Sequence, residues 1–413
     1  MKKLLFLGAA PTQISPIEYA LEKGHYVITC DNKPENPGHR LAHESYVVST
    51  TDKEAVLGLA RDKQIDGVVA YASDPAAPTA AYVAEHLGLP GNPYESVLIL
   101  SHKDKFREFL HKHGFNAPRS RSFVEELPAR EWLQQLAFPV YVKPVDSSGG
   151  KGITVLESEE GFSAAFAHAK SFSIEKRVIL EEKIPNRVGY QNDSDVFMVD
   201  GKLKFWVWGD SHFNYTCSPP FQAASSFPSV RPDALSAKAR KELEHILWLL
   251  GFKVGAFNVE FIIDDKDEIW FLEVGARNGG GGTVDAIKYA TGVDLAKYTV
   301  DAALGDDCSE LHDNKTLGYW AECLVHSSEE GVMQSLMLSD SLKRAIIRQN
   351  IWAKPGDYIY KAKGSNHALG TMILNFKTKD EMLDVLDNIS HHVKVVFINS
   401  QVAQEGNDWL HAV

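Results

Sequence analysis

The feature that most constrains this chain is an apolar stretch with two glutamates, which reads GAFNVEFIIDDKDEIWFLEVGARNGGGG from Gly255 to Gly282. Residues Phe257 to Ile263 and Ile269 to Val274 favour strands, and the intervening DDKD is typical of a turn. The pattern predicts a β-hairpin with Glu260 on one strand and Glu273 on the other. A carboxylate buried among apolar residues must be paired, protonated or bound to a metal. Two such carboxylates aimed at one point predict a site for a hard divalent cation.

The residues around the second strand extend this prediction. Strand alternation places Leu272 on the face opposite Glu273. Arg277 follows four residues after Glu273, and Gly279 to Gly282 allow the backbone to approach a ligand closely. The alternative is a surface hairpin with two solvated acids and a flexible glycine turn. We favour the site, because buried charges are rarely left without a partner.

Composition limits the class of protein. The chain has 413 residues, of which 44% are hydrophobic and 24% charged, as in a globular protein of two or three domains. Its net charge of −12 argues against nucleic-acid and anionic-membrane partners, and no apolar run approaches the length of a membrane span. The opening MKKLLFLGAAP mimics a signal peptide, but we interpret its short apolar core as a buried strand.

The cysteines indicate the compartment. Cys30, Cys217, Cys308 and Cys323 have neither metal-site nor redox spacing. We therefore expect free thiols in a reducing compartment and a cytoplasmic protein.

The N-terminal region alternates between strand and helix patterns. A strand at Lys3 to Leu7, a helix around Ile17 to Lys23 and a strand at Tyr26 to Cys30 form a βαβ opening. This opening predicts a doubly wound domain with a parallel sheet. Only Gly8 of a GxGxxG fingerprint is present, so we interpret it as a domain without a dinucleotide.

Later segments have other patterns. Val196 to Val199 and Lys202 to Trp208 flank an Asp-Gly turn and predict a hairpin. The long polar segment from Gly209 to Val230 is expected to be irregular, with His212 exposed. Beyond about Leu317, the chain is expected to be mostly strands.

A second glycine-rich stretch, DSSGGKG, lies between two predicted strands at Asp146 to Gly152. Such a loop offers backbone N–H groups to phosphate oxygens, although the GxxxxGK[ST] pattern of a P-loop is absent. Lys143 ends the preceding strand, and Lys105 lies on an earlier predicted helix. Each lysine alone would more often be a solvated surface residue. The lysines, the loop and the metal site together have one economical explanation, a bound Mg-nucleoside triphosphate.

The order of these segments resembles the ATP-grasp superfamily across nearly the whole chain. The matching segments, after the doubly wound opening, are SHKDKFREFLHKHGFNAPRS, FPVYVKPVDSSGGKGI, VILEEKIP and the metal hairpin. The spacing of Glu260, Glu273 and Arg277 and the C-terminal GDYIYKAKGSNHALGTMI resemble the L-amino-acid ligase branch. The resemblance implies an α/β fold, α+β in its middle and C-terminal parts, with a pre-ATP-grasp domain at 1–100, an ATP-grasp domain at 101–316 and a C-terminal β-rich domain at 317–413.

The resemblance also implies a role for each matching residue, in binding the phosphates, adenine and ribose, metal or substrate. Lys105 and Lys143 would contact the ATP phosphates, Ser147, Ser148, Gly149 and Gly150 would cover them, and Glu181, Glu182, Lys183 and Ile184 would form the hinge around adenine and ribose, with Leu272 under the adenine. Glu260 and Glu273 would hold Mg²⁺, or Mn²⁺ in its place. Arg277 would be the catalytic residue on the substrate carboxylate or acyl phosphate, unless it only pairs with an acid such as Asp285.

Two positions depart from the superfamily pattern. The Asn that usually follows the second Glu by two residues, as a further metal ligand, is here Gly275, which puts that ligand in doubt. The hinge is normally followed by a Glu that binds ribose, and Gln191 is the candidate for that role.

We therefore expect an ATP-dependent carboxylate–amine ligase that forms an amide through an acyl phosphate and releases ADP and phosphate. Its expected partners are small-molecule carboxylates and amines, with amino acids among the candidates, without nucleic acid or membrane. A homodimer is compatible with the sequence. The alternatives are a catalytically reduced ATP-binding regulatory protein, favoured only by Gly275, and a carboxylase or purine-pathway ligase of the same superfamily. An oxidoreductase is disfavoured by the missing glycine fingerprint.

Overall fold

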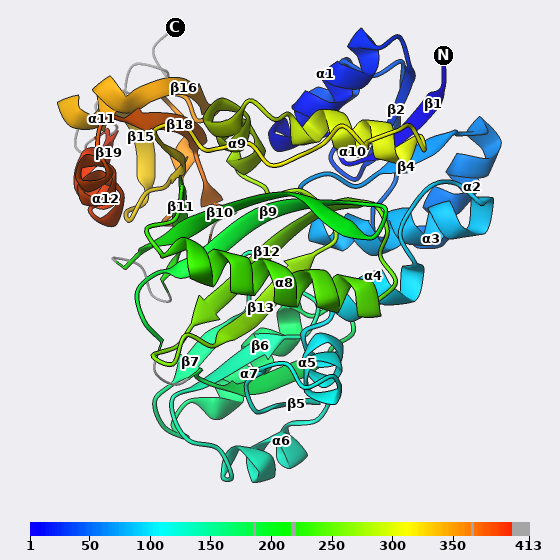
Figure 1. The fold of residues 1–413 in the computed structure, drawn as a ribbon. Coiled ribbons are helices and arrows are strands. Elements are labelled where there is room, and N and C mark those ends of the chain that lie inside the picture. The colour runs from blue at the N-terminus through cyan, green and yellow to red at the C-terminus, as the bar shows by residue number, and fades with distance from the viewer. Residues whose placement is uncertain (185–186, 216–219, 365–366, 399–413) are drawn as a thin grey trace, which may run out of the picture.

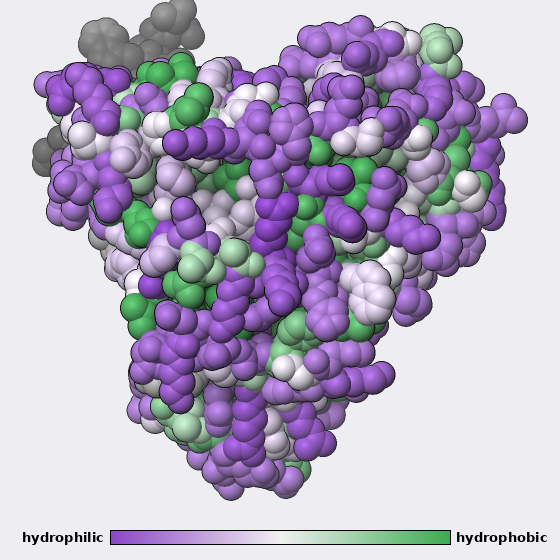
Figure 2. All heavy atoms as spheres, viewed as in Figure 1, coloured by the Kyte–Doolittle hydropathy of each residue, from purple (hydrophilic) through white to green (hydrophobic). Residues whose placement is uncertain are grey.

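The computed structural model describes residues 1–184, 187–215, 220–364 and 367–398, which form a mixed α/β fold around one large sheet (Figure 1). The N-terminal part lies at the upper right of this view and the C-terminal part at the upper left, with a smaller sheet below. In these described ranges, no helix combines the length and the apolar character needed to cross a membrane. The face drawn in Figure 2 is mainly hydrophilic, and a notch at the top of the view separates the N-terminal and C-terminal parts.

The N-terminal part is the parallel sheet that the βαβ opening predicts, with strand order β3-β2-β1-β4. Two backbone N–H groups that follow β1 already have partners within the chain. The Ala9 N–H donates to Asp31 and the Ala10 N–H donates to Gln13. The elements are β1 (Lys3–Leu7), η1 (Pro11–Gln13), α1 (Ile14–Glu22), β2 (Tyr26–Asp31), η2 (Pro37–Arg40), β3 (Glu44–Val47), α2 (Lys53–Lys63), β4 (Gly67–Val69), η3 (Asp74–Ala76), α3 (Ala77–Leu87) and α4 (Tyr94–Ser101).

A small antiparallel sheet with order β5-β8-β6-β7 follows. The glycine-rich loop connects β6 to β7, as expected from the sequence. The elements are α5 (Lys103–Lys112), β5 (Ser120–Phe123), α6 (Glu126–Leu133), β6 (Val140–Pro144), β7 (Thr154–Leu156), α7 (Phe162–Phe172) and β8 (Val178–Glu182).

The large antiparallel sheet has the order β13-β12-β9-β10-β11-β14-β18-β16. It is continuous across residue 317, because β11 pairs with β14. Its strands and the helices on its two faces are β9 (Gln191–Val199), β10 (Lys202–Asn214), β11 (Phe221–Phe227), α8 (Asp233–Leu249), β12 (Gly255–Ile263), β13 (Ile269–Gly275), α9 (Thr283–Thr291), α10 (Leu295–Ala303), β14 (Tyr319–Val325), β16 (Ile346–Ile351) and β18 (Gly370–Phe376).

The rest of the C-terminal part is a three-stranded sheet with order β17-β15-β19 and short helices. Together with β14, β16 and β18, it gives the strand-rich region expected beyond Leu317. The elements are β15 (Gly331–Leu338), α11 (Asp340–Ala345), β17 (Tyr358–Ile359), α12 (Lys379–Asp387), α13 (Ile389–His392) and β19 (Val393–Phe397).

The two faces of the large sheet differ in chemistry. On one face, Phe257 and Val259 pack against Leu243 and Ile246 of α8 in a shared apolar cluster. The other face is apolar toward one end of the strands, at Phe197 and neighbouring residues, and polar toward the other end. Because side chains alternate along a strand, this second face carries the acids described below.

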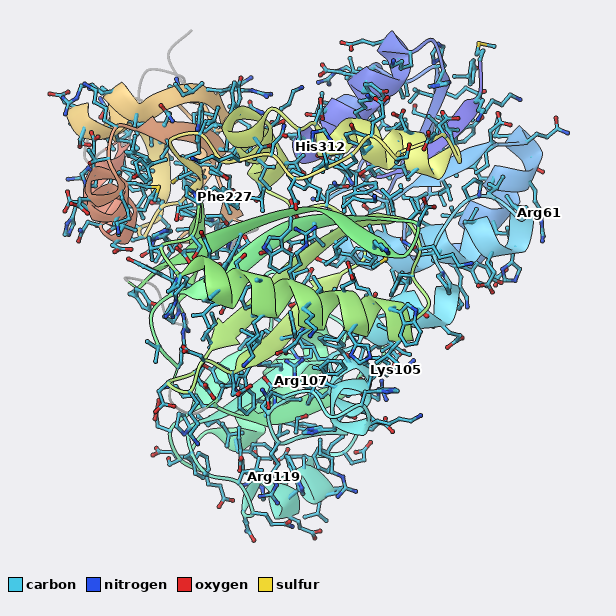
Figure 3. All side chains as sticks on the ribbon, viewed as in Figure 1. Arg61, Lys105, Arg107, Arg119, Phe227 and His312 are labelled. Carbon is cyan, nitrogen blue, oxygen red and sulfur yellow. The ribbon has the colours of Figure 1, made fainter. Side chains whose placement is uncertain are left out.

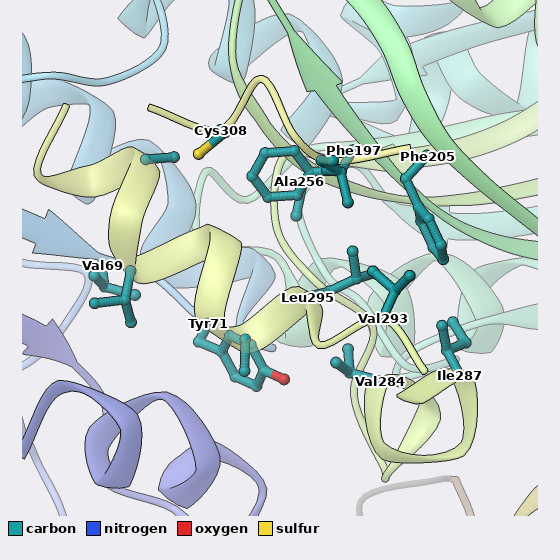
Figure 4. Close-up of a cluster of buried hydrophobic side chains, with 14 of the residues drawn as sticks. Val69, Tyr71, Phe197, Phe205, Ala256, Val284, Ile287, Val293, Leu295 and Cys308 are labelled. Carbon is teal, nitrogen blue, oxygen red and sulfur yellow. The ribbon is translucent and has the colours of Figure 1, made fainter. Parts of the chain in front are cut away.

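The apolar end of that second face is the joint between the N-terminal part and the large sheet. α10 supplies Leu295 and Val300 to a cluster that also contains Phe197 of β9 and Val69 and Tyr71 of the N-terminal part. Figure 4 shows Leu295 and Val293 between Tyr71 and Phe205. One continuous core therefore fixes the N-terminal part to the sheet.

The prediction for Gly209 to Val230 is wrong where the structure describes that segment. β10 continues to Asn214, and β11 occupies Phe221 to Phe227. His212, expected to be exposed, is 1% exposed, with Nδ1 2.8 Å from an Asp387 oxygen and Nε2 2.9 Å from Ser226 Oγ. Polar strands of this kind lack the apolar alternation on which strand prediction depends, yet ladder and side-chain hydrogen bonds satisfy them inside a sheet.

The expected free thiols are found where the structure describes them. Cys30, Cys308 and Cys323 are buried and unbonded. Cys217 lies outside the described residues.

Candidate active site

Three carboxylates lie in one row across the polar end of the large sheet. Glu260 of β12 is directly opposite Glu273 of β13, as the hairpin predicts, and directly opposite Asp193 of β9. Asn258 Nδ2 donates to Asp193 Oδ1 at 3.0 Å from the next row. Like charges directly opposite each other destabilise a sheet. The row is therefore held at an energetic cost that a bound cation would relieve.

The titration of this row follows from its burial. Burial raises the pKa of Glu260 to about 8, and the charges of Glu273 and Asp193 add to the effect. Burial and Asp193 likewise raise the pKa of Asp195 to about 7. A buried acid with such a pKa favours its protonated form until a positive charge arrives. These acids are thus poised to exchange protons for a cation.

The donor set fits Mg²⁺ bound together with phosphates. Glu260 and Glu273 offer hard oxygen ligands, and Gln191 Nε2 donates to Glu260 Oε2 at 2.8 Å. Across the described ranges, no group of three or more His, Cys, Asp or Glu side chains is arranged to hold a metal ion. Mg²⁺ usually binds through one or two carboxylates plus waters and substrate phosphates rather than in an all-protein cage. Two carboxylates are what that mode of binding requires.

Leu272 does not lie on the face opposite Glu273, so that prediction is wrong. A bulge between Glu260 and Phe261 leaves Leu272 unpaired on β13. Phe271 and Val274, on either side, both belong to the apolar cluster under α8. Since a bulge places two consecutive residues opposite one, Leu272 and Glu273 share the polar face. This placement is compatible with the expected role of Leu272 under adenine, which stays a prediction.

The lysine that contacts the glycine-rich loop is Lys103, which the sequence reasoning missed. Its Nζ donates to the Ser147 carbonyl at 2.7 Å and lies 3.7 Å from Glu273 Oε2. Successive residues of a helix are about 100° apart, so Lys103 and Lys105 point in nearly opposite directions from α5. No described contact joins the Lys105 side chain to the loop. Its role as a phosphate ligand stays a prediction, whereas Lys103 has the contacts.

Lys143 of β6 forms a buried charge cluster with Glu181 of β8 and Arg107 of α5. Glu181 accepts from Lys143 Nζ at 2.6 Å and from Arg107 Nε at 2.8 Å. Burial alone would raise the pKa of Glu181, but the two cations outweigh it and hold that pKa at about 2. Arg107 also donates to the Phe271 carbonyl at 3.5 Å and so links α5 to β13 (Figure 3). Two cations share one acid, which leaves a net positive charge beside the loop.

The remaining hinge residues make local contacts. Glu182 Oε1 accepts from the Ala137 N–H at 3.0 Å, and the Lys183 N–H donates to the Pro139 carbonyl at 3.2 Å. Ile184 is buried. None of these contacts tests the adenine and ribose roles of Glu181 to Ile184 or Gln191, which stay predictions.

Arg277 pairs with Asp74 rather than with Asp285. Its Nε and Nη2 donate to the two Asp74 oxygens at 2.7 Å each, and its Nη1 donates to the Asn278 carbonyl at 3.0 Å. A guanidinium has five N–H donors. One N–H on Nη1 and one on Nη2 therefore have no partner among the described residues. Asp285 instead accepts from Arg348 Nη1 at 3.0 Å.

The glycine run after Arg277 passes close to two buried acids. The Gly279 N–H donates to Asp195 Oδ1 at 3.0 Å. Gly281 has φ +70°, and a side chain there would collide with the Glu322 carboxylate from β14. Glu322 is 3% exposed. Glycine is needed here both for the backbone conformation and for the close approach to Glu322, whereas the expected approach to a ligand stays a prediction.

A cavity lies where the N-terminal part, the glycine run and the C-terminal part meet. It encloses about 590 Å³ of empty space, part of it open to solvent. Its walls include Tyr71, Gly281, Asp285 and Arg348. The cavity adjoins the active site through Gly279 and Gly281, so a second small molecule there would approach the same centre.

Sequence reasoning missed four further charged residues of this site, besides Lys103. Arg107 stands four positions after Lys103 on one helix face, a spacing that could have revealed it. Asp193 and Asp195 alternate in a strand that continues as VFMV, which indicates acids on a buried face. Asp74 carries no local signal, because only the packing of the N-terminal part brings it to Arg277.

Comparisons with known proteins identify one domain of the chain. Residues 108–290 match the family model of the ATP-grasp domain. The carbamoyl phosphate synthase large chain of Pseudothermotoga lettingae is 23% identical over 340 residues, which cover 77% of this chain and 29% of that protein. The formate-dependent phosphoribosylglycinamide formyltransferase of Wolinella succinogenes is 27% identical over 293 residues, covering 69% of this chain and 72% of that protein. The chain thus spans less than a third of the length of the synthase chain.

Solved structures share the fold over nearly the whole chain. The L-amino acid ligase from Bacillus licheniformis superposes with a TM-score of 0.79 at 19% identity, covering 97% of this chain and 99% of that one. The phosphoribosylglycinamide synthetase from Anaerococcus prevotii has a TM-score of 0.74 at 21% identity, covering 96% and 100%. Residues 108–290 therefore form an ATP-grasp domain, and the chain as a whole shares the fold of these solved structures.

The burial of Glu322 leads to a prediction about stability. Burial and the charge of Asp193 raise the pKa of Glu322 from 4.5 to about 8. Between these two pH values the folded state holds a proton that the unfolded state has lost, so stability falls as pH rises through this window. Glu322→Gln removes this loss. Its unfolding free energy should exceed that of the wild type increasingly from pH 5 to pH 8, by up to about 1.4 kcal/mol per pH unit.

The measurement is urea unfolding of both proteins at several pH values. Glu310→Gln, at an exposed glutamate, is the matched control and should follow the wild type. A Glu322→Gln curve parallel to the wild type across this range would show that Glu322 does not titrate there.

Proposed function

We propose that the protein is an ATP-dependent carboxylate–amine ligase that forms an amide through an acyl phosphate and releases ADP and phosphate. The observation that carries this proposal is the arrangement of Glu260 and Glu273 on one sheet face with Arg277 just beyond β13. Phosphoryl transfer needs positioning and charge stabilisation more than covalent protein chemistry. Paired carboxylates, a guanidinium and a lysine-lined glycine loop supply these.

The nucleotide would bind between the small sheet β5-β8-β6-β7 and the large sheet. Lys143 and Lys103 would hold phosphate oxygens, and Ser147 to Gly150 would cover them. The Arg107–Glu181–Lys143 cluster supports this role, because its net positive charge lies beside the loop. Mg²⁺ or Mn²⁺ bound through Glu260 and Glu273 would offset charge on the transferring phosphoryl group.

The acid substrate would bind at Arg277. Two N–H groups of its guanidinium are unused among the described residues, one on Nη1 and one on Nη2. They belong to one planar group, and a guanidinium suits the oxygens of a carboxylate or an acyl phosphate. A lysine at this position could not present two fixed donors.

The amine would enter from the cavity between the three parts. Asp285 and Arg348, an ion pair in its wall, present opposite charges 3.0 Å apart. An amino acid carries both a cationic and an anionic group, and each could exchange partners with this pair. This cavity supports amino acids as candidate amines.

A second candidate is the same chemistry on a one-carbon acid. The name of the Wolinella succinogenes relative, a formate-dependent enzyme, favours it. Formate has no side chain and would need only the unused N–H groups of Arg277.

The proposal is tested by phosphate release from ATP across paired acids and amines, including formate, with coupled product identified by mass spectrometry. We expect ADP and phosphate to form only when an acid and an amine are both present, together with an equal amount of amide. Release of phosphate without any amide across the panel would contradict the ligase.

Glu273→Gln should nearly abolish turnover. The substitution keeps the shape, removes one metal-binding charge and also removes the repulsion from Glu260, so the fold should be retained. We expect turnover to fall by about 10²–10³-fold at saturating Mg²⁺, the range seen when one electrostatic group of an active site is removed. Asp265→Asn, at the exposed hairpin turn, is the control. Wild-type rates in Glu273→Gln would rule out Glu273 as a metal ligand.

A further inference from the structure

We propose that Asp74 is a positioning residue, which fixes the guanidinium of Arg277 so that its free N–H groups face the acyl group, and that Gly275 provides the space for this contact. The inference rests on the proposed function for the identity of the acyl group. It assigns a role to a residue of the N-terminal part and to the position where the chain departs from the superfamily pattern.

The contact between Asp74 and Arg277 has a defined geometry. Asp74 accepts from Nε and Nη2 of Arg277, both at 2.7 Å, so it holds one edge of the guanidinium by two parallel bonds. The Asn278 carbonyl takes one N–H of Nη1 at 3.0 Å. Three bonds to two different groups fix both the plane and the rotation of the guanidinium. One N–H on Nη1 and one on Nη2 remain for a substrate.

Gly275 leaves space beside this contact. A Cβ on residue 275 would lie 2.7 Å from Asp74 Oδ1 and 3.1 Å from Arg277 Nε. Carbon and oxygen atoms do not approach so closely without displacement. Any larger side chain here would thus push the Asp74 carboxylate away from Arg277. Gly275 therefore leaves room for the ion pair, which gives the departure from the superfamily pattern a physical reason.

The groups around Asp74 favour its charged form. Burial raises the pKa of Asp74, but Arg277, Lys103 and a hydrogen bond from Ser148 outweigh it, so the pKa lies below its ordinary value. Asp74 remains ionised and so keeps its two hydrogen bonds with Arg277.

Buried neighbours in the chain hold Asp74 in place. It opens η3 directly after β4, between Tyr71 and Ala76, whose side chains are 4% and 0% exposed. Tyr71 belongs to the core that joins the N-terminal part to α10 and the large sheet. The contact with Arg277 is therefore made from a rigid support, and the N-terminal part completes the active site.

The test compares Asp74→Asn, Gly275→Ala and the double variant. Asp74→Asn removes the charge and leaves one acceptor, while Gly275→Ala displaces an intact Asp74. Each single variant should lower kcat for amide formation about 10- to 100-fold, as expected for losing one charge-assisted contact. The double variant should be no worse than the worse single one, because both changes break the same contact. Calorimetric ATP affinity should stay unchanged.

A second readout does not need turnover. In protein labelled with ¹⁵N-arginine, the Nε–H signal of Arg277, assigned by its absence in Arg277→Lys, should be protected from solvent exchange in the wild type. Protection should be lost in both single variants. Asp62→Asn and Gly58→Ala, an exposed aspartate and an unobstructed glycine of α2, are the matched controls and should change neither readout.

The outcomes separate the inference from the proposed function. Unprotected Arg277 in the wild type, or protection retained in both variants, would overturn the contact. Lost protection with a wild-type kcat would overturn the positioning role. A wild type that forms no amide from any pair would overturn the ligase, and the Nε–H signals would still decide whether Asp74 fixes Arg277.

Discussion

A row of acidic side chains on one face of the large sheet is the constraint on which the rest of the structure depends. Glu260, Glu273 and Asp193 stand in one row, and burial raises the pKa of Glu260 to about 8. A sheet would not hold such a row for stability alone, because like charges repel and burial penalises the charge of Glu260. The row is consistent with a site whose cations arrive with the substrate.

The positive charges around this row come from separate segments of the chain. Lys103 begins α5, Lys143 lies on β6, and Arg277 follows β13. Each is held by an acid or a carbonyl, so each is oriented before any ligand binds: Lys143 by Glu181, and Arg277 by Asp74. Pre-oriented charges need little rearrangement during a reaction, which is the main source of electrostatic catalysis. The core around α10 holds the N-terminal part, which carries Asp74, against the large sheet.

The sequence predicted the part of the site that depends on local periodicity. The hairpin, with Glu260 opposite Glu273, follows from two apolar strands and one polar turn, and the parallel N-terminal sheet follows from strand and helix alternation. The failures have particular causes. Leu272 lies on the same face as Glu273 because a bulge breaks the alternation, and β11 was missed because its polar residues are paired inside the sheet.

Other features could not be read from the sequence because they depend on packing. The choice between Lys103 and Lys105 requires the orientation of α5, and the partner of Arg277 is 203 positions away in the chain. Neither relation leaves a periodic pattern. The departure at Gly275, which the sequence marks as a missing ligand, acquires a physical reason only when the Asp74 carboxylate is seen beside it.

The central claim is that the protein joins a carboxylate to an amine through an acyl phosphate. It is tested most directly with the active acid labelled with ¹⁸O in its carboxylate, by mass spectrometry of the phosphate released. An acyl phosphate transfers one carboxylate oxygen to the phosphoryl group, so each inorganic phosphate should carry one ¹⁸O for each amide formed. Label found in AMP, or amide formed with unlabelled phosphate, would contradict the claim.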